Sequence, residues 1–347
     1  MQSAATAKSS IPVTDEWRAW IAENLWLDGD QNTLLHAMMA NGIDQNEAVR
    51  EIQLAANSPY VRGAVHAGHR VKNRLKKHDW VLEIYRKLNR QTPDAGVIER
   101  KHKLDEETFF RDYYLVNKPV IITGMMENWP ALTKWNYEYF KERLGGREVE
   151  VQKGRNQDAN YEINGPQHKT KMKFAEYVDM VASAGATNDF YMTANNTSSN
   201  KAALKELWDD IRVMPEYLDP RSSDSGFFWF GPAGTRTPFH HDLTNNFMAQ
   251  VIGRKQVKLM AACDVAHVYN HLHCYTPVDG SAVDYERFPM MRNVTVMDCT
   301  LNPGELLFLP VGCWHYVYAL DPSVTVSFIN FKLDNNYESF YTTYHDV

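Results

Sequence analysis

The fold is decided by residues 237–260, which read TPFHHDLTNNFMAQVIGRKQVKLM. Two runs of strand-forming residues, NFMAQVI and QVKLM, flank a turn at Gly253 within this stretch. Similar runs recur from residue 227 to residue 331, with further turns at Asn302 and Asp321. Many short strands with turns at this spacing predict an antiparallel barrel or a double-sheet jelly roll.

Upstream of this region the apolar residues follow a helical period. Trp17, Trp20 and Leu25 recur at three- and four-residue steps, and Asp44 precedes a further helical run as a candidate N-cap. Residues 69–90 predict a basic helix, and the sequence QTPDAG that follows is typical of a linker. We therefore expect a helical region over residues 1–95 and a mostly β domain with a double-stranded β-helix core over residues 96–347.

Composition excludes several classes of protein. The chain of 347 residues has a net charge of −6, so no overall basic field suggests nucleic acid as a partner. Its four cysteines form no C-x-x-C pair and its start lacks an apolar signal region, which favours a reducing, cytoplasmic location. No apolar run approaches the roughly 18 residues needed to cross a membrane.

The sequence TPFHHD carries the first candidate for chemistry. On an extended strand His240 and Asp242 point to the same face, whereas His241 points to the other. His240 and Asp242 can therefore converge on one atom, although two polar residues two apart on a strand also arise by coincidence. His315, in the strand-like sequence CWHYVYAL, is the candidate for a third ligand. Two histidines and one carboxylate form the facial triad of non-haem Fe(II) oxygenases, which leaves positions open for other ligands.

Three stretches together carry a family resemblance. They are residues 237–260, the sequence NPGELLFLPVGCWHYVYALDPSVTVSFINF at 302–331, and VNKPVIITGMMENWPALTKW at 116–135. In this order they resemble the JmjC family of Fe(II)/2-oxoglutarate oxygenases, in particular the hydroxylase branch with the asparaginyl hydroxylase that inhibits hypoxia-inducible factor, and cupin-like bacterial proteins. The resemblance covers roughly residues 105–335.

The resemblance implies a role for each matching residue. His240, Asp242 and His315 would be the iron ligands. Residues that would hold the cosubstrate 2-oxoglutarate, with O2 as the second cosubstrate, are Lys255, Thr237, Asn246, Asn330 and Tyr191.

Each cosubstrate residue also has a simpler interpretation. Lys255 next to the Gly253 turn could be an exposed hairpin lysine, and Tyr191 an ordinary core tyrosine. Asn330 falls in an apolar row, so its amide needs either a ligand or a backbone partner. A buried dicarboxylate, by contrast, needs a cation and hydrogen-bond donors.

A second cluster of possible metal ligands lies at His267, His271, His273 and Cys274, but no second pair stands at a zinc-finger distance. H-E-x-x-H, G-x-G-x-x-G and G-x-S-x-G motifs are absent from the sequence. We therefore interpret this cluster as a variable loop.

The resemblance implies hydroxylation of an amino-acid residue in a peptide or protein, with succinate and CO2 as coproducts. Demethylation of an N-methyl group, or hydroxylation of a free amino acid, another small molecule or a modified tRNA base, would use the same core. A non-catalytic metal-binding interaction module is the alternative of another class. The N-terminal helices are candidates for a homodimer contact.

Overall fold

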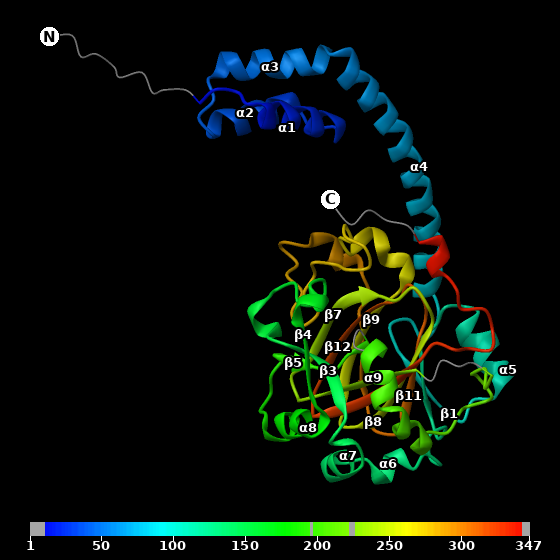
Figure 1. Cartoon of the computed structure of the whole chain (residues 1–347). Coiled ribbons are helices and arrows are strands. Elements are labelled where there is room, and N and C mark those ends of the chain that lie inside the picture. The colour runs from blue at the N-terminus through cyan, green and yellow to red at the C-terminus, as the bar shows by residue number, and fades with distance from the viewer. Residues whose placement is uncertain (1–10, 195–196, 222–225, 342–347) are drawn as a thin grey trace. The chain divides into compact units, whose positions relative to one another are not determined.

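The computed structural model describes residues 11–194, 197–221 and 226–341 (Figure 1). The chain forms two compact units, one up to Leu82 and one from Glu83 onward. The domain boundary at residue 95 stays a prediction, since compactness alone does not test it.

The first unit is helical, as predicted. Asp44 is the N-cap that the sequence indicated, because its carboxylate accepts hydrogen bonds from the backbone N–H groups of Asn46 and Glu47. Its small core contains Ile21, Leu34, Met38, Ala48 and Ile52. The helices that begin in this unit are α1 (Asp15–Trp26), α2 (Gln31–Ala40), α3 (Gln45–Asn57) and α4 (Pro59–Arg90).

Helix α4 is longer than the sequence suggested, because the basic segment at 69–90 is the second part of one helix of 32 residues. Val71 and Leu75, on its expected apolar side, are 52% and 53% exposed. Among the described residues, no helix is long and apolar enough to cross a membrane.

The second unit is built on two mainly antiparallel sheets and a small third sheet. The larger sheet has the order β1-β2-β11-β8-β13-β6, the facing one β10-β9-β12-β7, and the third β4-β3-β5. The pair β1 and β2 is parallel, and the other pairs are antiparallel. The strands are β1 (Glu99–His102), β2 (Val120–Thr123), β3 (Glu148–Lys153), β4 (Lys169–Lys173), β5 (Phe190–Tyr191), β6 (Phe227–Gly231), β7 (Arg236–His241), β8 (Asn246–Ile252), β9 (Lys255–Met260), β10 (Met297–Leu301), β11 (Glu305–Leu309), β12 (Trp314–Ala319) and β13 (Ser323–Phe328).

The jelly-roll prediction is confirmed, with two local differences. Residues 189–194 have the composition of a strand, but β5 has two residues because Met192 makes a single bridge to Phe230 instead of continuing a ladder. Residues 294–299, VTVMDC, have the composition of one strand, but β10 begins at Met297, since Val294 and Val296 pack in a separate apolar cluster before it.

Side-chain alternation separates the two faces of the larger sheet. On β8, Phe247 and Ala249 point into an apolar core shared with the flanking helices, whereas Asn246 and Met248 point toward the facing sheet. Apolar side chains such as Leu307 and Val257 fill part of the space between the two sheets. The remainder of that space is a cavity, which contains the candidate site.

Short helices cover the outer face of the larger sheet. Phe140 of α7 and Phe174 of α8 pack against Phe230 on β6, and α7 and α8 lie side by side (Figure 1). The helices of this unit are α5 (Glu106–Phe109), η1 (Phe110–Tyr114), α6 (Ala131–Lys134), α7 (Tyr137–Leu144), η2 (Arg155–Gln157), η3 (Gly165–His168), α8 (Phe174–Ser183), α9 (Thr197–Ala203), η5 (Lys205–Asp210), η6 (Ala262–His267), η7 (Pro289–Asn293) and η8 (Glu338–Phe340).

Candidate metal centre and adjoining cavity

The cavity between the sheets has a volume of about 310 Å³. Both sheets line it, with Asn246 and Thr325 from the larger sheet and Thr237, Lys255 and His315 from the smaller one. Side chains that were predicted from distant parts of the sequence therefore face the same enclosed space.

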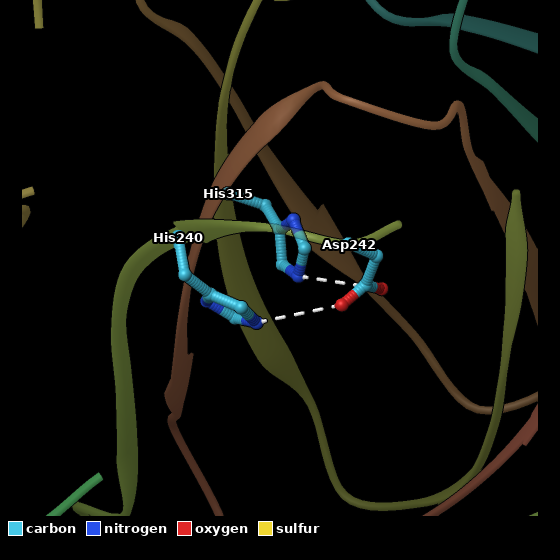
Figure 2. A group of neighbouring side chains, drawn as sticks. All are labelled: His240, Asp242 and His315. Carbon is cyan, nitrogen blue, oxygen red and sulfur yellow. Dashed lines mark ion pairs between the residues drawn. The ribbon is translucent and has the colours of Figure 1, made fainter. Parts of the chain in front are cut away.

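His240, Asp242 and His315 converge on one point of this cavity (Figure 2). Strands β7 and β12 pair so that His315 lies directly opposite His240, and Asp242 follows the end of β7. Nε2 of His240 lies 3.7 Å from Oδ1 of Asp242, and Nε2 of His315 lies 3.9 Å from Oδ2. One ligand atom from each residue lies within 4.8 Å of the others, so the group can hold a metal ion.

Backbone contacts orient both imidazole rings. Nδ1 of His240 donates to the carbonyl of Pro238 at 2.9 Å, and Nδ1 of His315 to that of Cys313 at 3.1 Å. A proton on Nδ1 leaves the lone pair on Nε2, which is the atom that points at Asp242 in each ring. The two rings are thus set in the tautomer that binds a metal.

The electrostatics of the group suit a cation. Burial, reinforced by the nearby His315, lowers the pKa of His240. Burial raises the pKa of Asp242, but the charges of His315 and His240, together with the hydrogen bond from Asn246, hold this pKa below its ordinary value. Asn246 also donates to Oδ2 of Asp242 at 3.2 Å. A neutral imidazole beside an ionised carboxylate is the state in which both coordinate metals.

The neighbouring histidines do not join this group. His241 packs edge-on against Trp314, on the other side of the strand as expected. Among the described residues, the triad is the one group of three or more potential metal ligands, and the cluster at His271, His273 and Cys274 forms none. The zinc alternative for that cluster therefore has no geometric support.

Lys255 is a buried cation in the same cavity, 2% exposed. Its ammonium group donates to the hydroxyl of Tyr191 at 3.0 Å, and within the described residues no carboxylate forms an ion pair with it. Burial lowers the pKa of Lys255 to about 7 and raises that of Tyr191. The exposed-hairpin interpretation of Lys255 is wrong.

Strand alternation and two glycines position the side chains of Lys255 and Tyr191. Lys255 begins β9 on the same face as Val257, which packs between the sheets. Gly253, at the preceding turn, has a φ of +68°, and a Cβ there would lie 2.3 Å from the carbonyl oxygen of Pro322. A Cβ on Gly231 would lie 2.6 Å from the Tyr191 ring, so glycine lets this ring approach the sheet.

Of the other three residues predicted to hold the cosubstrate, two line the cavity and one does not. Thr237 and Asn246 line the cavity. Asn330 does not line it, because it follows the face of β13 that carries Val326 and Phe328 into the outer core, and its amide donates to the carbonyl of Asp219 at 3.2 Å. This backbone partner satisfies the amide N–H, but Oδ1 of Asn330 is buried and has no hydrogen-bond partner among the described residues. A role for Asn330 at the cosubstrate therefore stays a prediction.

Several cavity residues were missed by sequence reasoning. Thr325 and Ser327 line the cavity, and the alternating pattern of VTVSF could have placed both on the inner face. Glu162, Trp229 and Tyr275 also line it. Glu162 and Tyr275 come from outside the sheet strands, so no periodic pattern in the sequence pointed to them.

The sequence of the chain is similar to those of known proteins. Residues 106–335 match the cupin-like domain family. The chain is 35% identical over 229 residues to lysine-specific demethylase 8 of Xenopus tropicalis, which covers 63% of this chain and 49% of that protein. It is 36% identical over 241 residues to lysine-specific demethylase JMJ30 of Arabidopsis thaliana, covering 67% and 54%.

A more distant relative is tRNA wybutosine-synthesizing protein 5 of Gallus gallus, 26% identical over 238 residues and covering 64% of this chain and 73% of that protein. The chain spans about half the length of the two demethylases. The matched segment contains both sheets except β1, and the triad and Lys255 lie inside it. The chain belongs to the cupin-like, JmjC-type family of Fe(II)/2-oxoglutarate oxygenases.

Proposed function

We propose that this chain is an Fe(II)- and 2-oxoglutarate-dependent dioxygenase that hydroxylates a C–H bond of an amino-acid residue in a peptide or protein. The observation that supports this most strongly is the pairing of two features in one cavity. A triad with metal-binding geometry faces the same space as a buried lysine that has no carboxylate partner among the described residues.

The residues present fit both groups. Two imidazole nitrogens and one carboxylate oxygen are the donor set of the facial triad, so His240, Asp242 and His315 would hold Fe(II). A buried ammonium without a counter-charge is costly, and the distal carboxylate of 2-oxoglutarate would relieve that cost at Lys255. When bound, Fe(II) with 2-oxoglutarate and O2 supplies the oxidising chemistry, and succinate and CO2 leave as coproducts.

The chain's own residues do the positioning. The backbone carbonyls behind His240 and His315 keep both Nε2 atoms aimed at the metal position. Tyr191 and Thr237 would complete the hydrogen bonds to the carboxylate that Lys255 neutralises. Lys255 and His315 are buried in the walls of the cavity, which strengthens the charge interactions at these two side chains.

N-methyl demethylation is the second candidate, because two relatives at 35% and 36% identity are named lysine-specific demethylases. Hydroxylation of a small molecule would use the same residues. The alternative of another class is a non-catalytic metal-binding module, which has no need of the Lys255 pocket.

Succinate formation from 2-oxoglutarate tests the proposal. Purified protein with Fe(II), O2 and a peptide library should form succinate, and His240→Ala should not. Mass spectrometry of the peptides separates the reactions, since hydroxylation adds one oxygen atom and demethylation removes one methylene unit. Equal succinate formation by both proteins, or none with any substrate, would support the non-catalytic module.

We also propose a protein or peptide partner, and a homodimer contact through the N-terminal helices. The exposed apolar residues Val71 and Leu75 on α4 support such a contact. A reducing cytoplasmic location is consistent with four free cysteines. Light scattering of the full chain, with and without Leu75→Glu, tests the dimer, which this substitution should dissociate.

A further inference from the structure

Two asparagines far apart in the sequence form a closed hydrogen-bond pair behind the candidate metal centre. Oδ1 of Asn335 accepts from the backbone N–H of Asn245 at 2.8 Å and from its side-chain amide at 3.0 Å. The Asn335 amide donates in return to the backbone carbonyl of Asn245 at 2.9 Å. Asn245 is 1% exposed and Asn335 is half-buried, so these contacts are partly shielded from water.

The pair connects to the segments that carry two of the three candidate ligands, Asp242 and His315. Asn246, the next residue after Asn245, donates to the Asp242 carboxylate. On the other side, Oδ1 of Asn245 accepts from the backbone N–H of Val311 at 2.9 Å, in the turn that leads to His315. Within this turn, the N–H of Gly312 donates to the carbonyl of Asp242 at 3.1 Å.

The turn also holds a ring of the triad directly. Residue 313 follows Gly312, and the carbonyl of Cys313 accepts from Nδ1 of His315 at 3.1 Å. A displacement of the turn would therefore rotate His315, and a displacement of Asn245 would move the Asn246 amide away from Asp242. Both effects would change the distances among the three ligand atoms.

Asn335 is itself fixed to the core from the opposite side. Its amide donates a second hydrogen bond to the carbonyl of Ile329 at 2.8 Å. The preceding residue, Asp334, accepts from the Tyr114 hydroxyl at 3.1 Å, and the N–H of Lys332 donates to the carbonyl of Tyr217 at 3.0 Å. The segment that carries Asn335 is thus anchored to the aromatic core before it reaches the loop.

We infer that Asn335, through Asn245, is a positioning residue that sets the geometry of the metal centre formed by His240, Asp242 and His315. The C-terminal segment after β13 thereby becomes a structural part of the site, although it supplies no ligand. Outer contacts of this kind commonly change metal affinity by roughly 10- to 100-fold. The inference rests on the proposed metal site, but it does not need the proposed oxygenase reaction.

The test measures Co(II) binding by the full chain, using the visible absorption of the bound ion, which reports its coordination geometry. Asn335→Ala should weaken Co(II) binding by about 10- to 100-fold and change the spectrum. Asn336→Ala is the matched control, because this exposed neighbour contacts neither Asn245 nor Ile329 through any hydrogen bond found among the described residues. It should bind Co(II) as the wild type does.

Asn335→Asp keeps the oxygen that accepts from Asn245 and loses the donated bonds, so its affinity should fall between those of the wild type and Asn335→Ala. This variant carries the test if Asn335→Ala fails to fold by circular dichroism. Folded variants with wild-type affinity and spectrum would overturn the inference. Co(II) binding without any succinate formation would contradict the proposed function alone, and absence of Co(II) binding in the wild type would contradict both.

Discussion

The metal triad and Lys255 lie in the same cavity but differ in how many partners the protein gives them. Every side chain of the triad has partners within the protein. His240 and His315 each donate to a backbone carbonyl, and Asp242 lies between the two imidazoles. Lys255 instead has the Tyr191 hydroxyl as its hydrogen-bond partner and no ion pair among the described residues. The comparison indicates that the metal position is preorganised, whereas the Lys255 pocket depends on an arriving anion to balance its charge.

The largest loss of metal binding and activity should come from removing a ligand of the preorganised triad. His315→Ala removes one of the three proposed ligands, so metal affinity and succinate formation should each fall by more than about 100-fold, beyond the range typical of outer contacts. His271→Ala is the matched control, because this histidine is exposed and outside the triad. Metal titration followed by turnover measures both, and unchanged metal binding would remove His315 from the ligand set.

Removing the charge of Lys255 should weaken 2-oxoglutarate binding but stabilise the protein that lacks cosubstrate. Lys255→Met should weaken 2-oxoglutarate binding by at least about 30-fold, equivalent to about 2 kcal/mol, since the carboxylate loses its buried partner. Without cosubstrate, the same change should raise the free energy of unfolding below pH 7 by about 1–3 kcal/mol, because an unpaired buried charge is removed.

Calorimetric titration and denaturant unfolding measure these two quantities. Lys258→Met is the control for binding, because Lys258 lies on the other face of β9 and donates to Gly280 at 2.6 Å. A destabilised Lys255→Met protein with normal cosubstrate affinity would contradict the proposed role of Lys255.

The pH dependence of stability tests whether Lys255 lacks a counter-charge. Burial lowers the pKa of Lys255 to about 7, whereas an unfolded chain keeps it near 10.4, so the unfolded state binds more protons between these values. The stability of the cosubstrate-free protein should therefore rise with pH from about 7 to about 10, and Lys255→Met should lack this rise.

Cosubstrate binding should follow the opposite trend. Because the dicarboxylate needs the protonated ammonium, its Kd should increase by up to about tenfold for each pH unit above 7. Titrations of wild type and Lys255→Met with Mn(II) in place of Fe(II) measure this slope without turnover. A wild-type Kd that does not change from pH 6 to about 9 would contradict the depressed pKa.

The smallest effects on 2-oxoglutarate binding should distinguish Thr237, which lines the cavity, from Asn330, which does not. Thr237→Val should raise the Kd for 2-oxoglutarate by about fivefold, the loss expected for one neutral hydrogen bond of about 1 kcal/mol. Asn330→Ala should leave this Kd unchanged and lower thermal stability slightly, since its amide contacts Asp219. A larger effect at Asn330 than at Thr237 would restore the role that the family resemblance implied.

Sequence reasoning predicted the fold and the His240–Asp242 pair from short-range regularities, whereas His315 was assigned as the third ligand by family resemblance. Period-2 alternation put His240 and Asp242 on one face, and the jelly-roll pattern was visible in the spacing of strands and turns. The same alternation separates Asn330 from the cavity, since Val324, Val326 and Phe328 precede it on the outer face.

Other features could not be read from the sequence. The burial of Lys255 depends on how two sheets face each other, and the Asn245–Asn335 pair joins residues 90 positions apart. Neither follows from any local period. Glu162 and Tyr275 reach the cavity from segments without regular strands, so their placement depends on the assembled fold.

The most direct test is a crystal structure of the full chain grown without oxygen in the presence of Fe(II) and 2-oxoglutarate. We expect iron bound by Nε2 of His240, Nε2 of His315 and the Asp242 carboxylate, with no fourth protein ligand. The distal carboxylate of 2-oxoglutarate should contact Lys255 and Tyr191. Iron bound elsewhere, a fourth protein ligand, or a cosubstrate carboxylate remote from Lys255 would contradict the account.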